Sequence, residues 1–132
     1  MQLDFLDTNV LLYLLSVDQV KAQKTQALLA KRAVISVQVL NEFANVARRK
    51  LNMPIAEIQA ILQDIRHFCQ VLPLSLATHE SGLVLCERYD FALYDAMIVA
   101  SSLEAKSVVL WSEDFQHGLH VNEKLTINNP FL

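Results

Sequence analysis

A chain of 132 residues is long enough for one domain with a single hydrophobic core. Hydrophobic residues make up 53% of it and charged residues 19%, which excludes an intrinsically disordered chain, and three prolines and two glycines leave no room for a flexible linker. The net charge of −3 speaks against a nucleic-acid binder, unless bound metal ions cancel the negative charge where the nucleic acid lies. We therefore expect one domain over residues 1–132.

Apolar residues recur at helical spacing in some segments and form short runs in others, which predicts helices that alternate with strands. We interpret Ser36, Pro54 and Thr78 as residues at which helices start. The expected elements, in chain order, are a strand at 3–6, helices at 10–15 and 19–32, a strand at 33–35, helices at 37–50 and 54–65, a strand at 71–74, helices at 79–89 and 94–106, and strands at 108–111 and 125–127.

This alternation predicts a parallel sheet that is covered by helices on both faces. In such sheets, ligands bind beyond the carboxyl ends of the strands. Polar and acidic residues that directly follow the expected strands are therefore the first candidates for a functional site.

The start of the chain has no basic segment and carries Asp4 and Asp7 within its apolar stretch, so we expect no signal peptide. The apolar runs are too short to span a membrane. Cys69 and Cys86 lie among apolar neighbours without the spacing of a metal site, and we interpret them as reduced thiols of the core. These features predict a cytoplasmic protein.

Three aspartates stand where expected strands end or helices begin. Asp7 closes the first strand, Asp114 follows the strand at 108–111, and Asp95 opens a strongly apolar helix. Each of them alone can be explained as a helix cap or as a charge at the positive end of a helix. Asp7 and Asp114 can nevertheless share one edge of a parallel sheet, which would place them in one site.

Glu42 has no such simple explanation. It lies on the apolar flank of its expected helix, between Leu40 and Phe43. No positive charge is found among the residues three and four positions away, which are Gln38, Val39, Asn45 and Val46. A carboxylate on an apolar helix flank needs a partner, and a metal ion would be one.

Four carboxylates brought together repel one another, and a divalent cation reverses that repulsion. Oxygen ligands without histidine or cysteine select magnesium or manganese over zinc. Such ions polarise phosphoryl oxygens and activate water, and two of them can hold the attacking and leaving oxygens together. The sequence therefore predicts phosphate chemistry with Mg²⁺ or Mn²⁺, and leaves open whether one ion or two are bound at rest.

Together these motifs resemble the PIN-domain family, and the resemblance covers essentially the whole chain. In length the chain is similar to the VapC-like toxin ribonucleases of bacterial toxin–antitoxin pairs. The motifs that carry the resemblance are, in order, the strand that runs into Asp7-Thr8-Asn9, the mid-helix Glu42, the helix start Tyr94-Asp95-Ala96, and the late Ser112-Glu113-Asp114-Phe115.

The resemblance implies a three-layer α/β/α sandwich with a mostly parallel central sheet, and a Mg²⁺- or Mn²⁺-dependent endoribonuclease that hydrolyses phosphodiester bonds. The family often has threonine two residues before its last acid, where this chain has a serine, and the neighbouring Glu113 could share or replace the role of that acid. The implied catalytic and metal-binding residues are Asp7, Glu42, Asp95 and Asp114. The implied residues that orient these ligands are Thr8, Asn9 and Ser112.

The resemblance also implies an RNA substrate, a homodimer, and a small antitoxin protein that covers the acidic pocket, with no role for a membrane. Basic residues such as Arg48, Arg49 and Lys50 could line an RNA path, although most such clusters are simply solvated helix faces. The alternative is a PIN-like fold without catalysis that acts by binding another protein. The RNA target stays open.

Overall fold

The computed structural model describes residues 2–132, and Met1, the first residue of the expected domain, lies outside them. Strands and helices alternate along most of the chain. In order they are β1 (Phe5–Leu6), α1 (Thr8–Leu12), the 3-10 helix η1 (Tyr13–Leu15), α2 (Gln19–Ala30), β2 (Ala33–Ser36), α3 (Val37–Leu51), α4 (Ile55–His67), β3 (Cys69–Leu72), α5 (Leu76–Tyr89), α6 (Leu93–Glu104), β4 (Val109–Trp111), β5 (Leu119–Val121) and β6 (Leu125–Asn128).

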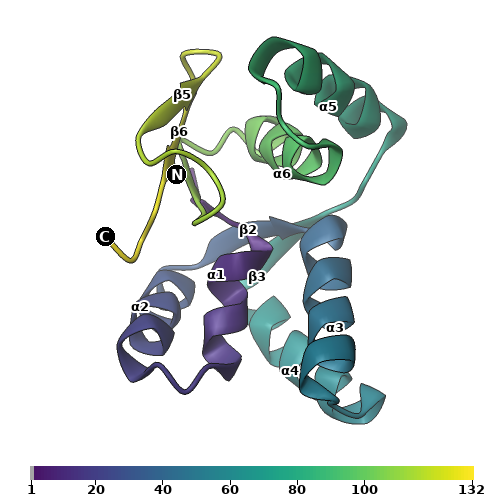
Figure 1. Cartoon of the computed structure of the whole chain (residues 1–132), viewed down its shortest axis with the longest axis vertical. Helices are drawn as coiled ribbons and strands as arrows, with labels where there is room; N and C mark the ends of the chain where they lie inside the picture. Colours follow the sequence, from purple (N-terminus) through teal and green to yellow (C-terminus); the bar gives the residue numbers. More distant parts are fainter. Residues whose placement is uncertain (1) are drawn as a thin grey trace.

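The six strands form one sheet in the order β3-β2-β1-β4-β6-β5. All neighbouring pairs are parallel except β5 and β6, which run antiparallel. Helices α1 to α4 cover one face of the sheet, and α5 and α6 cover the other (Figure 1). The expected mostly parallel sheet between two helical layers is confirmed.

The strand order reverses between β1 and β4. From β1 the chain proceeds outward to β2 and β3, and it then returns to place β4 on the other side of β1. Asp7 and Ser112 follow these two central strands, and the Asp7 N–H donates to the carbonyl oxygen of Trp111 at 3.0 Å. Because ligands of such sheets bind where the order reverses, this junction is the expected position of a site.

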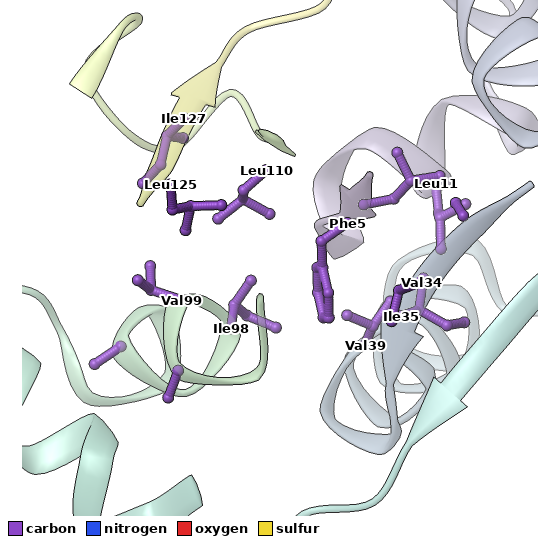
Figure 2. Packing of buried hydrophobic residues seen from close by; sticks show 14 of the residues in the cluster. Phe5, Leu11, Val34, Ile35, Val39, Ile98, Val99, Leu110, Leu125 and Ile127 are labelled. Atoms are coloured by element: carbon purple, nitrogen blue, oxygen red, sulfur yellow. The ribbon is translucent and has the colours of Figure 1, made fainter. Parts of the chain in front are cut away.

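Buried apolar side chains fill both sides of the sheet. Phe5 lies beside Ile35 and Val39, while the α6 residues Ile98 and Val99 face the strands β4 and β6 (Figure 2). Residues 96–102 of α6 are buried without interruption, which is expected for a helix packed between the sheet and α5. The first turn of α6, which contains Asp95, is therefore held on a fixed element.

Most expected boundaries were off by one or two residues, as for the first strand, which begins at Phe5 and not at residue 3, and one was off by three. The third strand covers Cys69–Leu72 and not residues 71–74. Helix α5 begins at Leu76, because Ser75 and not Thr78 is its N-cap. The two hydroxyl groups form a capping box, in which Ser75 Oγ accepts from the Thr78 N–H at 3.1 Å and Thr78 Oγ1 accepts from the Ser75 N–H at 3.3 Å.

Strand β5 was not predicted at all. Only three residues long, with His120 exposed at its centre, it has no apolar run from which it could be recognised. Its pairing with β6 depends on the turn between them, where Asn122 and Glu123 adopt positive φ angles of 51° and 58°. Tertiary pairing, and not local sequence preference, determines this strand.

Cys69 and Cys86 are free thiols, both half-buried and packed against the edge of the core. Burial raises the pKa of the Cys69 thiol to about 11, so it stays protonated at neutral pH. Over residues 2–132 the structure contains no helix with the length and apolar character needed to cross a membrane.

Replacing Phe43 with alanine tests the packing of α3. Phe43 is fully buried next to Glu42, so Phe43→Ala should lower the free energy of unfolding by about 3–5 kcal/mol, measured by urea denaturation. Asn45→Ala, on the exposed side of the same helix, should change it by about 0.5 kcal/mol or less. A loss below about 1 kcal/mol for Phe43→Ala would contradict the described packing.

Candidate active site

Asp7 is a buried carboxylate at the junction of β1 and α1, with 3% of its surface exposed. It is the N-cap of α1, and its Oδ1 accepts from the Thr8 N–H at 2.6 Å. Its Oδ2 accepts from Ser112 Oγ at 2.7 Å and from Asn9 Nδ2 at 3.2 Å. The capping role that the sequence suggested is therefore real, and the same side chain also faces the loop after β4.

That loop is fixed by the same polar groups. Ser112, which is fully buried, accepts from Asn9 Nδ2 at 3.2 Å and from the Asp114 N–H at 3.1 Å. Asn9 Oδ1 accepts from the Glu113 N–H at 3.1 Å. Asn9 thus links the first turn of α1 to the residues that follow β4.

Glu42 enters the same region from the second turn of α3. Its half-buried carboxylate accepts a hydrogen bond from Thr8 Oγ1 at 2.7 Å, through Oε1. The sequence predicted that Glu42 needs a partner. One partner is the hydroxyl group of Thr8 in α1. Thr8 contacts two acids of the site, since its N–H donates to Asp7.

Asp95 and Asp114 are near enough to the other acids for their charges to affect one another. Asp95 is half-buried in the first turn of α6, and Asp114 is exposed in the loop after β4. Burial raises the pKa of Asp95, and the negative charges of Asp114 and Glu42 raise it further. We call Asp7, Glu42, Asp95 and Asp114 the acidic cluster.

The buried carboxyl group of Asp7 has a strongly raised pKa. Burial raises its pKa from 3.8 to about 7. The hydrogen bonds from Ser112 and the Thr8 N–H oppose that rise, while the charges of Asp114 and Glu42 add to it. A carboxylate that is half-protonated at neutral pH in this setting would gain from a nearby cation.

The donor chemistry of the acidic cluster fits a hard divalent ion. All four side chains offer carboxylate oxygens, without a histidine or cysteine among them, and such oxygen sets suit Mg²⁺ or Mn²⁺. Within residues 2–132, no three His, Cys, Asp or Glu side chains are gathered into a ready-made metal site. The assignment of the four acids as metal ligands therefore stays a prediction.

The neighbouring acids Glu113 and Asp114 have different surroundings in the structure. The Glu113 carboxylate accepts from Tyr13 Oη at 2.8 Å and lies 3.5 Å from Lys21 Nζ, whereas the charge of Asp114 reaches Asp7 and Asp95. No sequence pattern connected Tyr13 and Lys21 to the site, because their partner lies about a hundred residues away along the chain.

A cavity of about 390 Å³ adjoins the site between η1 and α3. It reaches Asn9 and Glu113 at one end and Lys50 at the end of α3. Its remaining lining is largely apolar and comprises Leu12, Tyr13, Leu15, Ser16, Val46 and Leu51.

A sequence profile of the PIN domain matches residues 5–118, which include all four acids of the cluster. No curated protein sequence matches the chain significantly.

Solved structures share this fold at low identity. VapC20 of Mycobacterium tuberculosis, described as a toxin that cleaves the sarcin-ricin loop, matches with a TM-score of 0.67 at 17% identity, over 84% of this chain and 91% of that one. A toxin–antitoxin complex from Klebsiella pneumoniae gives 0.73 at 18%, over 96% and 97%. VapBC2 of Rickettsia felis, bound to a promoter DNA fragment, gives 0.68 at 16%, over 96% and 97%.

The raised pKa of Asp7 predicts how stability depends on pH. Between pH 3.8 and about 7 the folded protein holds a proton that the unfolded chain has released. The free energy of unfolding of the metal-free protein should therefore fall as pH rises through this range, by up to about 4 kcal/mol. The raised pKa of Asp95 acts in the same direction.

Urea denaturation in the presence of a chelator, at steps from pH 4.5 to 8, measures this slope. Asp7→Asn should flatten it, whereas Asp64→Asn, at an exposed position of α4, should leave it unchanged. A free energy of unfolding that stays constant or rises with pH would show that Asp7 is ionised throughout.

Proposed function

The chain belongs to the PIN domain family, and from this membership and the acidic cluster we propose that it is an endoribonuclease that hydrolyses RNA with Mg²⁺ or Mn²⁺. The observation that carries the proposal is the burial of Asp7, whose pKa of about 7 reflects a carboxylate held at a cost next to other acids. Such a costly arrangement is typical of functional sites.

In this proposal Asp7, Glu42, Asp95 and Asp114 hold the ion. A bound divalent ion would polarise a phosphoryl oxygen of the RNA and lower the pKa of a water molecule. The fold brings the four acids from four different elements, so the site depends on the whole sandwich and not on one loop.

The neighbouring polar residues orient these acids. Ser112 and Asn9 donate to one oxygen of Asp7, which fixes the plane of its carboxylate. Thr8 donates its hydroxyl to Glu42 and so ties α1 to α3. Hydrogen bonds of this kind hold metal ligands in the geometry that binding requires.

We further propose that the protein is the toxin of a toxin–antitoxin pair in the cytoplasm. Support comes from the similar structures, two of which are described as toxin–antitoxin or VapBC assemblies. The apolar cavity beside the acids would suit a protein segment that covers them.

A homodimer is part of the same proposal. A second cavity, of about 460 Å³, lies where α5 and α6 begin, and exposed apolar side chains surround it. These side chains include Leu74, Leu76, Leu93 and Tyr94, and the last of them directly precedes Asp95. Exposed apolar groups gathered at one place are typical of protein contacts.

Asp7→Asn should abolish RNA cleavage while it leaves the fold intact. We expect a loss of at least about 100-fold in the cleavage rate with Mn²⁺ or Mg²⁺, because the substitution removes a central carboxylate. Its metal-free stability at pH 8 should be equal to or above that of the native chain, since a costly buried charge is gone.

The matched control is again Asp64→Asn, which should cleave at the native rate. If the native chain and Asp7→Asn both fail to cleave RNA, and calorimetry finds no Mn²⁺ binding by the native chain, the protein is a PIN-like binding module without catalysis. Equal cleavage by both chains would remove Asp7 from the reaction.

Thr8→Val tests the orienting role of the Thr8 hydroxyl at nearly constant shape. The Glu42 carboxylate loses its 2.7 Å hydrogen bond, and we expect the affinity for Mn²⁺, measured by calorimetry, to fall by about 10-fold. Thr8→Ser keeps the hydroxyl and should stay within about threefold of the native chain. Equal affinities of Thr8→Val and Thr8→Ser would show that the hydroxyl does not orient Glu42.

A further inference from the structure

Lys21 and Glu113 form the one ion pair found within residues 2–132, and it lies at the edge of the acidic cluster. Lys21 Nζ is 3.5 Å from Glu113 Oε2. Tyr13 Oη donates to Glu113 Oε1 at 2.8 Å and accepts from Lys21 Nζ at 3.2 Å. We call Tyr13, Lys21 and Glu113 the Glu113 clamp.

Two aromatic rings support the Glu113 clamp. Lys21 Nζ lies 4.6 Å from the centroid of the Tyr13 ring and 5.4 Å from that of Phe131. The two rings meet edge to face, with centroids 4.7 Å apart. Ring faces attract the ammonium group in addition to the carboxylate, so Lys21 is restricted on several sides.

The Glu113 clamp and the acidic cluster both include residues that contact the loop after β4. Ser112 donates to Asp7, and the Asp114 N–H donates back to Ser112. Between them, the Glu113 N–H donates to Asn9 while its side chain turns away to Tyr13. Glu113 is therefore anchored through both its backbone and its side chain, which determines where Asp114 can lie.

We propose that Tyr13 and Lys21 are positioning residues that keep Glu113 out of the acidic cluster and so fix Asp114 as its fourth carboxylate. This inference rests on the proposed function. Without the Glu113 clamp, the Glu113 side chain would be a fifth carboxylate beside Asp114, free to compete for the same cation and to displace the loop. The Glu113 carboxylate instead pairs with the positive charge of Lys21 and accepts a hydrogen bond from the Tyr13 hydroxyl.

Calorimetric titration of the chelator-treated full chain with Mn²⁺ tests this inference. Lys21→Met should weaken Mn²⁺ binding by about 10-fold, as expected for loss of a group that positions a ligand. Lys24→Met removes an exposed lysine from the same helix and should leave binding unchanged. Lys21→Arg retains the charge and should stay within about threefold of the native affinity.

The double variant Lys21→Met/Glu113→Gln distinguishes two roles of Lys21: keeping the Glu113 carboxylate away from the acidic cluster, or only attaching α2 to the loop after β4. If free Glu113 is the harmful group, removing its charge should restore Mn²⁺ affinity to within about threefold of the native chain. If the ion pair only fastens α2 to the loop, the double variant should bind no better than Lys21→Met, which would overturn the inference. Thermal unfolding of each variant shows whether stability changes in parallel with affinity.

Amide hydrogen exchange of the metal-free protein gives a second readout without any ion. In Lys21→Met and in Tyr13→Phe, the amides of residues 112–114 should exchange about 10-fold faster than in the native chain, while those of α6 stay unchanged. Unchanged exchange in this loop would contradict the proposed anchoring, whether or not the protein binds Mn²⁺.

Asp7→Asn in the same titration distinguishes a failure of the Glu113 clamp inference from a failure of the proposed function. If Asp7→Asn loses Mn²⁺ binding and Lys21→Met does not change it, the inference about the Glu113 clamp fails and the proposed function stands. If Asp7→Asn binds Mn²⁺ like the native chain, the acidic cluster is not the metal site, and both fail.

Discussion

The arrangement of the β1–α1 junction and of the loop after β4 depends on one buried carboxylate. Asp7 caps α1, and its backbone extends the pairing of β1 with β4 through the hydrogen bond to Trp111. Its oxygens are enclosed by donors from Thr8, Asn9 and Ser112, yet burial still raises its pKa to about 7. A protein does not need so costly a cap, because a serine would serve the helix as well. The cost is understandable if the carboxylate binds a cation.

The order of the strands explains why the other acids are found here. Because β1 and β4 adjoin at the reversal of strand order, the residues after them lie next to each other at one edge of the sheet. Helix α3 brings Glu42 from one helical layer and α6 brings Asp95 from the other. The buried faces of these helices, at Phe43 and along residues 96–102, hold the two acids in place. The packing of the core thus also determines where Glu42 and Asp95 lie.

Local patterns were enough to predict most of the fold and to single out four acids, whose role as one site stays a prediction. Apolar runs and helical periodicity identify central strands and amphipathic helices. Acids at the ends of these elements are then candidates for a functional site. Strand β5 escaped prediction because only its pairing with β6 creates it. The Glu113 clamp was missed for a similar reason, since Glu113 lies 92 and 100 residues along the chain from its other two members, and no periodicity relates them. The hydroxyl partner of Glu42, Thr8, likewise became visible only when α1 and α3 were placed together.

A crystal structure of the native chain soaked in Mn²⁺ would show whether the acidic cluster binds a metal ion. Anomalous scattering locates manganese without assumptions about its ligands. We expect an ion bound by oxygens of Asp7 and at least one other acid of the cluster, at distances of about 2.0–2.3 Å. No anomalous peak at the cluster under saturating Mn²⁺, or a peak held only by other residues, would contradict it.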